Sequence, residues 1–152
     1  MAPPKHKRPS FNEAVRDLKK QPAAAEEAED WREKQPNWAF SRCDLRGCRW
    51  SWEHVNGETL VQIIDRLKGH ESLAWKQILL EKSNGSIEIS HPKIDGDAKQ
   101  RLVDLGLGNF DAIWKLRVDG PGRVWGVRKG RTFHIVWWDP EHTVYPLNIA
   151  NH

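Results

Sequence analysis

Cysteine and long apolar runs are scarce in this sequence, and each scarcity excludes a class of protein. Only two of the 152 residues are cysteines, Cys43 and Cys48, so the chain cannot be built on a disulfide framework. No apolar run is long enough for a signal peptide or a membrane span. We therefore expect a soluble, cytoplasmic protein with no membrane contact and no cofactor.

Net charge is also small, at +3, although 30% of the residues are charged. A histone-like polycation is thereby excluded, and positive charge can act only where it is clustered. Tryptophan, in contrast, is abundant, with nine copies against a single tyrosine. A tryptophan brings a large apolar surface and one N–H that needs a partner. The rings are therefore expected to form a core or to serve as platforms for a ligand.

The C-terminal third shows the alternation of three short strands joined by tight turns. Side chains in Ile113–Val118 alternate between two faces, with Lys115 and Arg117 on the same face. Glycine-rich turns follow at residues 119–122 and 129–131. The other two strands are expected at Arg123–Arg128 and Thr132–Trp138, and Pro140 ends the last one.

This predicted meander is strongly basic, with one acid, Asp119, in residues 113–131. Cations on a sheet can meet phosphates, and flat rings such as Trp125 can stack on unpaired bases, so the pattern suits RNA. The alternative is that the charges are the solvated face of a sheet and the tryptophans its core. The candidate nucleic-acid-binding residues are Lys115, Arg117, Arg123, Trp125, Arg128, Lys129 and Arg131.

Upstream, the sequence divides near residue 36, where Gln35-Pro36 interrupts the pattern. Residues 1–36 are expected to form a flexible or helical charged extension, in which Ser10 to Glu13 is a capping box that opens a helix through about Lys20. A second helix is predicted over Ala23–Lys34. Residues 37–148 are expected to form the folded domain.

Within that domain we predict an α+β fold, a small antiparallel sheet whose terminal meander packs on two or three helices. A strand is expected at Cys48–His54, with Phe40–Leu45 as its hairpin partner. Residues 87–89 fit either a short strand or an extended linker. Helices are predicted over Glu58–Lys68, Glu71–Glu81 and Ile94–Leu105.

This order of elements resembles the RelE/ParE-like toxin superfamily over about residues 45–146. The resemblance is carried by Leu116-Arg117, Gly122-Arg123-Val124 and the apolar strand Phe133–Val136. It implies a metal-independent cut of messenger RNA, made by side chains on the meander, with RNA or the ribosome as target and an antitoxin protein as partner. Members that act on proteins leave open a non-enzymatic interaction module of the same fold.

If the chain cleaves RNA, it needs a base, an acid and cations beside the phosphate. His142 is the first candidate for base or acid, because imidazole titrates near neutrality. Arg117 and Arg123 are candidate phosphate clamps, and Tyr145 is a candidate proton donor. His142 could instead anchor the C-terminal turn by hydrogen bonds, and Tyr145 could be a surface or core-edge ring.

Two metal sites are alternatives to the expectation of no metal. Asp139, Glu141 and His142 could meet in one turn as ligands, although an aspartate there more often caps the turn. Cys43 and Cys48 could bind zinc with His54, but no second pair completes four ligands, and two cysteines flanking a turn is the simpler interpretation.

Overall fold

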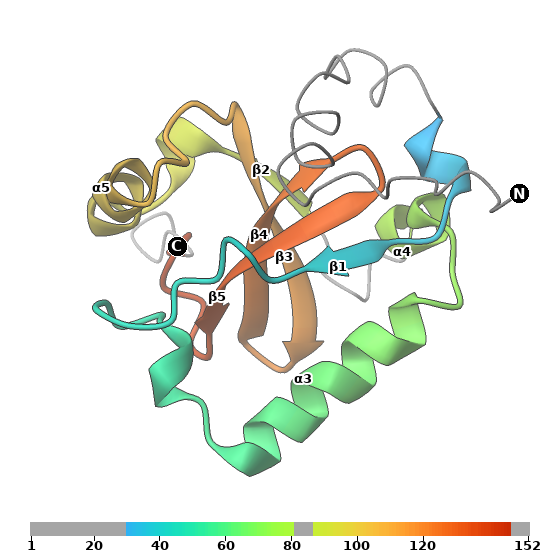
Figure 1. The fold of residues 1–152 in the computed structure, drawn as a ribbon, viewed down its shortest axis with the longest axis horizontal. Coiled ribbons are helices and arrows are strands. Elements are labelled where there is room, and N and C mark those ends of the chain that lie inside the picture. The colour runs from blue at the N-terminus through green and yellow to red at the C-terminus, as the bar shows by residue number, and fades with distance from the viewer. Residues whose placement is uncertain (1–29, 81–86, 147–152) are drawn as a thin grey trace, which may run out of the picture.

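The computed structural model describes residues 30–80 and 87–146, which contain a five-stranded sheet in the order β1-β5-β4-β3-β2 (Figure 1). The predicted meander is confirmed as three antiparallel strands: β3 (Ala112–Asp119), β4 (Gly122–Lys129) and β5 (Thr132–Asp139). β2 (Ile87–Ser90) extends it antiparallel to β3, and β1 (Asn37–Ala39) pairs parallel to β5. The fold is α+β, as predicted, with a sheet that is mostly antiparallel.

Tight turns and one irregularity shape the meander. Gly120 and Gly130 have φ values of 45° and 57°, a left-handed conformation that favours glycine in these turns. The register between β4 and β5 shifts at Trp125 and Gly126. At Gly126 the carbonyl of His134 and the ring of Phe133 occupy the space that a Cβ atom would need. Only glycine therefore fits at this irregularity without displacing β5.

One face of the sheet, named here the α3 face, packs against α3 (Gly57–His70), α4 (Trp75–Leu80) and the short 3₁₀ turn η1 (Trp31–Glu33). The Asn56 side chain accepts a hydrogen bond from the Thr59 N–H and begins α3. The buried core of this face is aromatic and aliphatic, and consists of Trp31, Ile63, Leu67, Trp75, Ile78, Trp114, Leu116, Val124, Phe133 and Ile135.

The opposite face, named the α5 face, packs against α5 (Gly96–Asp104), as Figure 1 shows. The Asp95 side chain caps this helix by accepting a hydrogen bond from the Asp97 N–H. The short turn η4 (His91–Lys93) leads into it. The apolar core here consists of Trp50, Ile89, Ile94, Ala98, Leu102, Leu107, Ile113, Trp125, Val136, Trp137 and Val144. The sheet is therefore covered on both faces.

A buried carboxylate, Asp44, holds the loop between β1 and α3 against the α5 face. Arg101 of α5 donates to both of its oxygens, at 2.8 and 2.7 Å, and the Trp137 indole N–H donates at 2.9 Å. Burial raises the pKa of Asp44, but the hydrogen bonds from Arg101, Trp137 and Cys48 outweigh it and leave the pKa below its ordinary value. Asp44 therefore links loop, helix and strand as an anion.

The helix predictions are confirmed with shifted ends. α3 contains the whole of the predicted Glu58–Lys68 helix, and α5 lies inside the predicted Ile94–Leu105 helix. α4 begins only at Trp75, because the Ser72 hydroxyl bonds back to the Gly69 carbonyl and the chain turns there before the helix starts. Residues 87–89 belong to a strand, which was one of the two alternatives.

The predicted strand Cys48–His54 and its partner Phe40–Leu45 are wrong. Residues 48–54 form local turns and a 3₁₀ turn, η2 (Trp52–His54). The Cys48 N–H donates to the Ser51 hydroxyl, and the Ser51 N–H donates back to the Cys48 carbonyl. The Ser51 hydroxyl and the Ser51 backbone N–H thus bond the Cys48 N–H and carbonyl, which a neighbouring strand would otherwise have bonded. The alternation of large side chains here reflects a turn.

The described part of the predicted extension packs with the domain. Trp31 is 5% exposed and belongs to the core of the α3 face, and β1 begins at Asn37. The helix predicted from Ser10 to Lys20, and the predicted helix from Ala23 as far as residue 29, lie outside the described residues. Over residues 30–34 the predicted helix is wrong, because the chain forms only the single 3₁₀ turn η1 and is extended at Lys34. Among residues 30–80 and 87–146, no helix is both long enough and apolar enough to cross a membrane.

Candidate acid–base site on the α5 face

Strand pairing gathers three cations on the α5 face. Lys115 and Arg117 are two residues apart on β3, so their side chains point to the same face. Arg123 on β4 is the cross-strand partner of Arg117, and Trp125 is the partner of Lys115. Directly opposed residues share a face, so the cations of β3 and β4 lie together.

The turn that follows β5 is built around Asp139. This side chain is fully buried, and its two oxygens accept four hydrogen bonds. The Trp125 indole N–H and the Val144 N–H donate to Oδ2 at 3.1 and 2.9 Å. The Thr143 N–H and hydroxyl donate to Oδ1 at 2.9 and 3.2 Å. Asp139 therefore caps the turn, as the simpler of its two interpretations predicted.

This turn places His142 directly against Lys115. His142 has a φ of 62°, an uncommon conformation for a non-glycine residue, and is 7% exposed. Its Nε2 atom lies 2.8 Å from the Lys115 Nζ atom, and its Nδ1 atom lies 2.8 Å from the Tyr145 carbonyl oxygen. A carbonyl only accepts, so Nδ1 carries the proton and Nε2 is free to accept from the lysine ammonium. The result is a buried lysine–histidine pair.

The surroundings of the pair lower both pKa values. Burial, followed by the charge of Arg123, lowers the pKa of Lys115 to about 8, although Asp139 acts in the opposite direction. Burial, with the charges of Lys115 and Arg123, also lowers the pKa of His142. Near pH 7 the histidine is therefore neutral and the lysine is mostly charged. This assignment agrees with the hydrogen bond between them.

The other candidate catalytic residues lie around this pair. Arg117 and Arg123 share its face, and Arg123 donates to the carbonyls of Gly120 and Gly122 at 2.7 and 3.0 Å. The Tyr145 ring centroid lies 6.4 Å from that of His142 and 5.8 Å from Lys115 Nζ. Tyr145 thus contributes a carbonyl to His142 and a ring face to Lys115.

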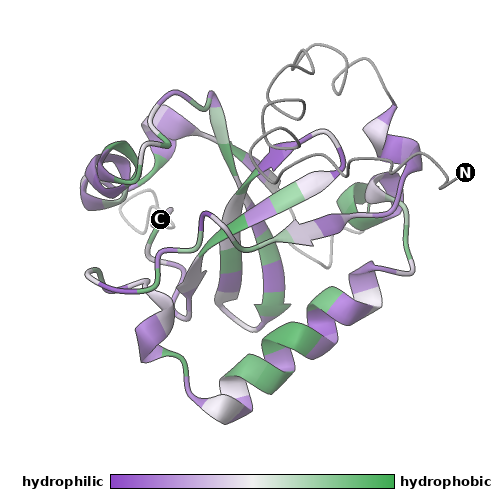
Figure 2. Ribbon diagram, viewed as in Figure 1, coloured by the Kyte–Doolittle hydropathy of each residue, from purple (hydrophilic) through white to green (hydrophobic). Residues whose placement is uncertain are grey.

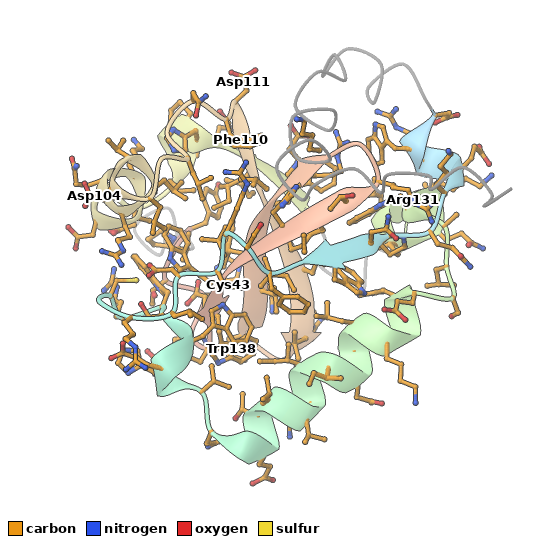
Figure 3. The ribbon with its side chains drawn as sticks, viewed as in Figure 1. Cys43, Asp104, Phe110, Asp111, Arg131 and Trp138 are labelled. Carbon is orange, nitrogen blue, oxygen red and sulfur yellow. The ribbon has the colours of Figure 1, made fainter. Side chains whose placement is uncertain are left out.

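The predicted nucleic-acid-binding residues are divided between two faces and the sheet end. Arg128 lies on the α3 face, with its guanidinium carbon 3.6 Å from the Trp31 ring centroid and 5.0 Å from that of Trp114. Lys129 is exposed at the end of β4. Arg131 lies at the opposite end of β5 from Trp138, as Figure 3 shows, and its Nε donates to the Gln35 carbonyl. Of the predicted cations, Lys115 belongs to the acid–base pair, and Arg117 and Arg123 share its face of the sheet.

Trp125 differs most from its predicted role. Its side chain is fully buried, and its N–H donates to Asp139. A ring enclosed in this way has no face on which a base could stack. Trp125 instead stabilises the turn that carries His142.

The residue that sequence analysis missed as a reactive group is Lys115, which was predicted only to bind phosphate. Its neighbour Arg117 shows the same alternation in sequence but is half-buried, whereas Lys115 is 6% exposed. Lys115 is buried because the turn at residues 139–145 folds over it and brings His142 and Tyr145 against it. The alternation of β3 carries no signal of that distant contact.

The two cysteines are free thiols, and their surroundings do not favour a thiolate. Burial raises the pKa of Cys43 to about 11 and is also the main cause of the raised pKa of Cys48. Cys48 Sγ lies 3.1 Å from Asp44 Oδ2 and donates to it. Among the described residues, no group of three or more His, Cys, Asp or Glu side chains is arranged to hold a metal ion.

Comparison with known proteins does not assign a function to this site. No protein-family model, curated protein or solved structure matches the chain.

Proposed function

We propose that this protein is an RNA-directed, metal-independent ribonuclease of the RelE-like kind that acts on messenger RNA. The observation that carries the proposal is the 2.8 Å contact between His142 Nε2 and Lys115 Nζ on a face shared with Arg117 and Arg123. Such a pair supplies a neutral base and a charged acid side by side. Perturbed pKa values that arise from burial and neighbouring charge are typical of catalytic groups.

In the proposed reaction the ribose 2′-oxygen attacks the adjacent phosphorus, and the bond from phosphorus to the 5′-oxygen breaks. Because Nε2 of neutral imidazole has one lone pair, the Lys115–His142 hydrogen bond opens as RNA binds. His142 Nε2 then takes the proton of the 2′-hydroxyl, and Lys115 Nζ gives a proton to the departing 5′-oxygen. No external reactant is needed, because one proton is taken and one is given. The products are a 2′,3′-cyclic phosphate and a 5′-hydroxyl.

After one cycle the histidine is protonated and the lysine is neutral. The pair is within hydrogen-bonding distance, at 2.8 Å, so the proton can return from Nε2 to Nζ once the products leave. Lys115 also has a pKa near 8, which suits a group that gives up a proton close to neutral pH.

Arg117 and Arg123 are proposed to hold the phosphate. A guanidinium remains charged at neutral pH and can donate two hydrogen bonds to one phosphate. Because the two residues are directly opposed on β3 and β4, their charges act on the same group. They would stabilise the additional negative charge that develops on the phosphate oxygens during attack.

The test is cleavage of messenger RNA by the full-length protein in EDTA, with and without ribosomes, followed by analysis of the new ends. We expect cyclic phosphate and 5′-hydroxyl ends, and a loss of about 100-fold or more in His142→Asn and Lys115→Met. Lys93→Met, which removes an exposed cation outside the meander, is the control and should retain activity. Absence of cleavage under both conditions, or equal cleavage by all variants, would refute the proposal.

A further inference from the structure

The outer side of α3 exposes apolar side chains that no described segment covers. Val61 and Ile64 are 67% and 55% exposed, and Leu60 beside them is 41% exposed. Figure 2 shows the apolar residues along the middle of this helix, and in Figure 1 no other helix lies on its outer side. Adjacent exposed apolar residues of this size on one helix mark an interaction surface more often than an ordinary surface.

The apolar surface continues across a hollow next to α3. Phe40, which is 66% exposed, lines this hollow together with Ile64 and Trp38, and its volume is about 850 Å³. Lys68 and Glu71 of α3 also border it, so the rim carries both signs of charge. A partner for this surface must therefore offer apolar side chains between charges of both signs.

α3 itself presents what such a partner must offer, namely apolar side chains between charges of both signs. Glu58 and Val61 are three residues apart, and Ile64 and Lys68 are four apart, so each charge lies beside an exposed apolar residue. All four side chains are exposed. An acid, Glu58, therefore stands at the start of the surface and a base, Lys68, at its end. Val61 and Ile64 lie between them, and a second exposed acid, Asp65, lies beside Val61 and Lys68.

A second copy of α3, running antiparallel, complements this order. Rotation about a two-fold axis between Val61 and Ile64 brings Val61 against Ile64 of the other copy, and Glu58 against its Lys68. Each contact occurs twice in such an isologous arrangement. A parallel copy would instead place like charges together.

We propose that α3 is the self-association surface of this protein, and that two chains pair through antiparallel α3 helices in solution. The helix has 14 residues and is about 21 Å long, so the contact is smaller than a standard interface. The dimer is expected to be weak and to exchange with monomer at about 10–100 µM. This proposal is independent of the ribonuclease proposal, because α3 lies on the other face of the sheet.

The first test is sedimentation equilibrium of the full-length chain across about 5–500 µM, a range that brackets such an affinity. The wild-type mass should rise from 17.6 kDa toward twice that value. Ile64→Glu should remain monomeric throughout. Gln62→Glu should behave as wild type, because Gln62 is exposed but points about 100° away from Val61 around the helix. A wild-type chain that stays monomeric at every concentration, or an Ile64→Glu variant that dimerises normally, would overturn the proposal.

The second test uses the symmetry of the charges. Glu58→Lys and Lys68→Glu should each weaken the dimer by about fivefold or more, because each creates two pairs of like charges. The double variant should regain wild-type dimerisation. Each single change also opposes the helix dipole, and these effects on folding add in the double variant. The double variant should therefore be the least stable of the three, so if it dimerises again, the loss in the single variants is due to charge pairing and not to poor folding. If the double variant does not dimerise, the antiparallel contact is excluded.

Discussion

The two faces of the central sheet are built from the same alternating strands and both bury an apolar core, but the α5 face also buries an acid–base pair. On β3, Trp114 and Leu116 enter an aromatic core on the α3 face. Lys115, between them, enters the α5 face and contacts His142. Neighbouring residues of one strand thus meet an apolar and an ionisable environment.

The difference lies in what covers each face. The α3 face is closed by rings in edge contact, among which Trp75 has centroids 6.2 Å from Trp31 and 6.1 Å from Trp114. The α5 face is closed in part by the turn at residues 139–145, whose polar groups are satisfied by Asp139. An aromatic cover needs only area and shape, whereas a polar cover must provide a partner for each buried donor and acceptor. Four substitutions sharpen this contrast.

The largest expected effect is the loss of Trp75, the centre of the α3 face. Its side chain is fully buried, and its N–H donates to the Arg131 carbonyl at 2.8 Å. Trp75→Ala should lower the free energy of unfolding by about 4 kcal/mol, through lost burial and a cavity. Leu80→Ala, on the same helix but 77% exposed, is the control and should change little. Equal urea midpoints for the two variants would mean that the aromatic cluster does not stabilise this face.

Loss of the Asp139 carboxylate should have the next largest effect, on the α5 face. Asp139→Asn preserves shape, but its amide group faces donors that now lack an acceptor, so the cost is about 2–3 kcal/mol. The NMR signals of His142 should also shift, because the turn that holds it opens. Glu141→Gln, exposed in the same turn, is the control. Unchanged stability and unchanged His142 signals would show that the turn does not depend on this carboxylate.

Removal of the buried charge of Lys115 should raise stability instead. Its folded pKa, about 8, lies below the ordinary 10.5, so the unfolded chain binds more protons between these values and wild-type stability rises with pH there. Lys115→Met should be more stable at pH 7 by roughly 2 kcal/mol and should lack this rise. The advantage should vanish above about pH 10.5.

Urea unfolding of Lys115→Met and wild type between pH 6 and about 11 checks this pattern. Lys129→Met is the control, since Lys129 is exposed, and its profile should follow wild type. A Lys115→Met variant that is less stable than wild type at every pH would mean that the lysine is held by contacts stronger than its burial cost.

The smallest effect concerns Arg128, the cation enclosed by the α3 face. Arg128→Met keeps the aliphatic stem but removes the guanidinium from the Trp31 and Trp114 rings, at a cost of about 1 kcal/mol. Arg32 also lies over Trp31, at 4.4 Å, but is exposed, so Arg32→Met should cost less. If Arg32→Met lowered the urea midpoint more than Arg128→Met, the enclosure of Arg128 between two rings would not explain the strength of its contact.

Much of the fold was predictable because its signals are local. The meander follows from alternation and from glycine turns at residues 119–122 and 129–131, and α3 follows from apolar spacing. The failures involve distant partners. β1 is a three-residue strand defined only by pairing with β5, and residues 48–54 alternate like a strand although Ser51 closes them into turns. Neither outcome can be obtained from spacing alone.

The candidate site was predictable in part for the same reason. His142, Arg117 and Arg123 were identified from residue type and strand position, and the structure places them on one face. The role of Lys115 was not predictable, because its low exposure depends on a turn 24 or more residues away in sequence that closes over it. In the sequence, the six cations of the meander also resembled one continuous surface. In the structure, three of them lie on the α5 face, Arg128 lies on the α3 face, and Lys129 and Arg131 lie at the ends of strands.

The most direct test of the acid–base pair is an NMR titration of the full-length protein that follows the His142 ring nitrogens and the Lys115 ammonium from pH 4 to 11. We predict that His142 is neutral at pH 7, carries its proton on Nδ1 and titrates below its ordinary value of 6.5, while Lys115 titrates near 8. In Lys115→Met, the pKa of His142 should rise, because a neighbouring positive charge is removed. A His142 that titrates at 6.5 or above in wild type, with Lys115 near 10.5, would contradict the pair and the mechanism built on it.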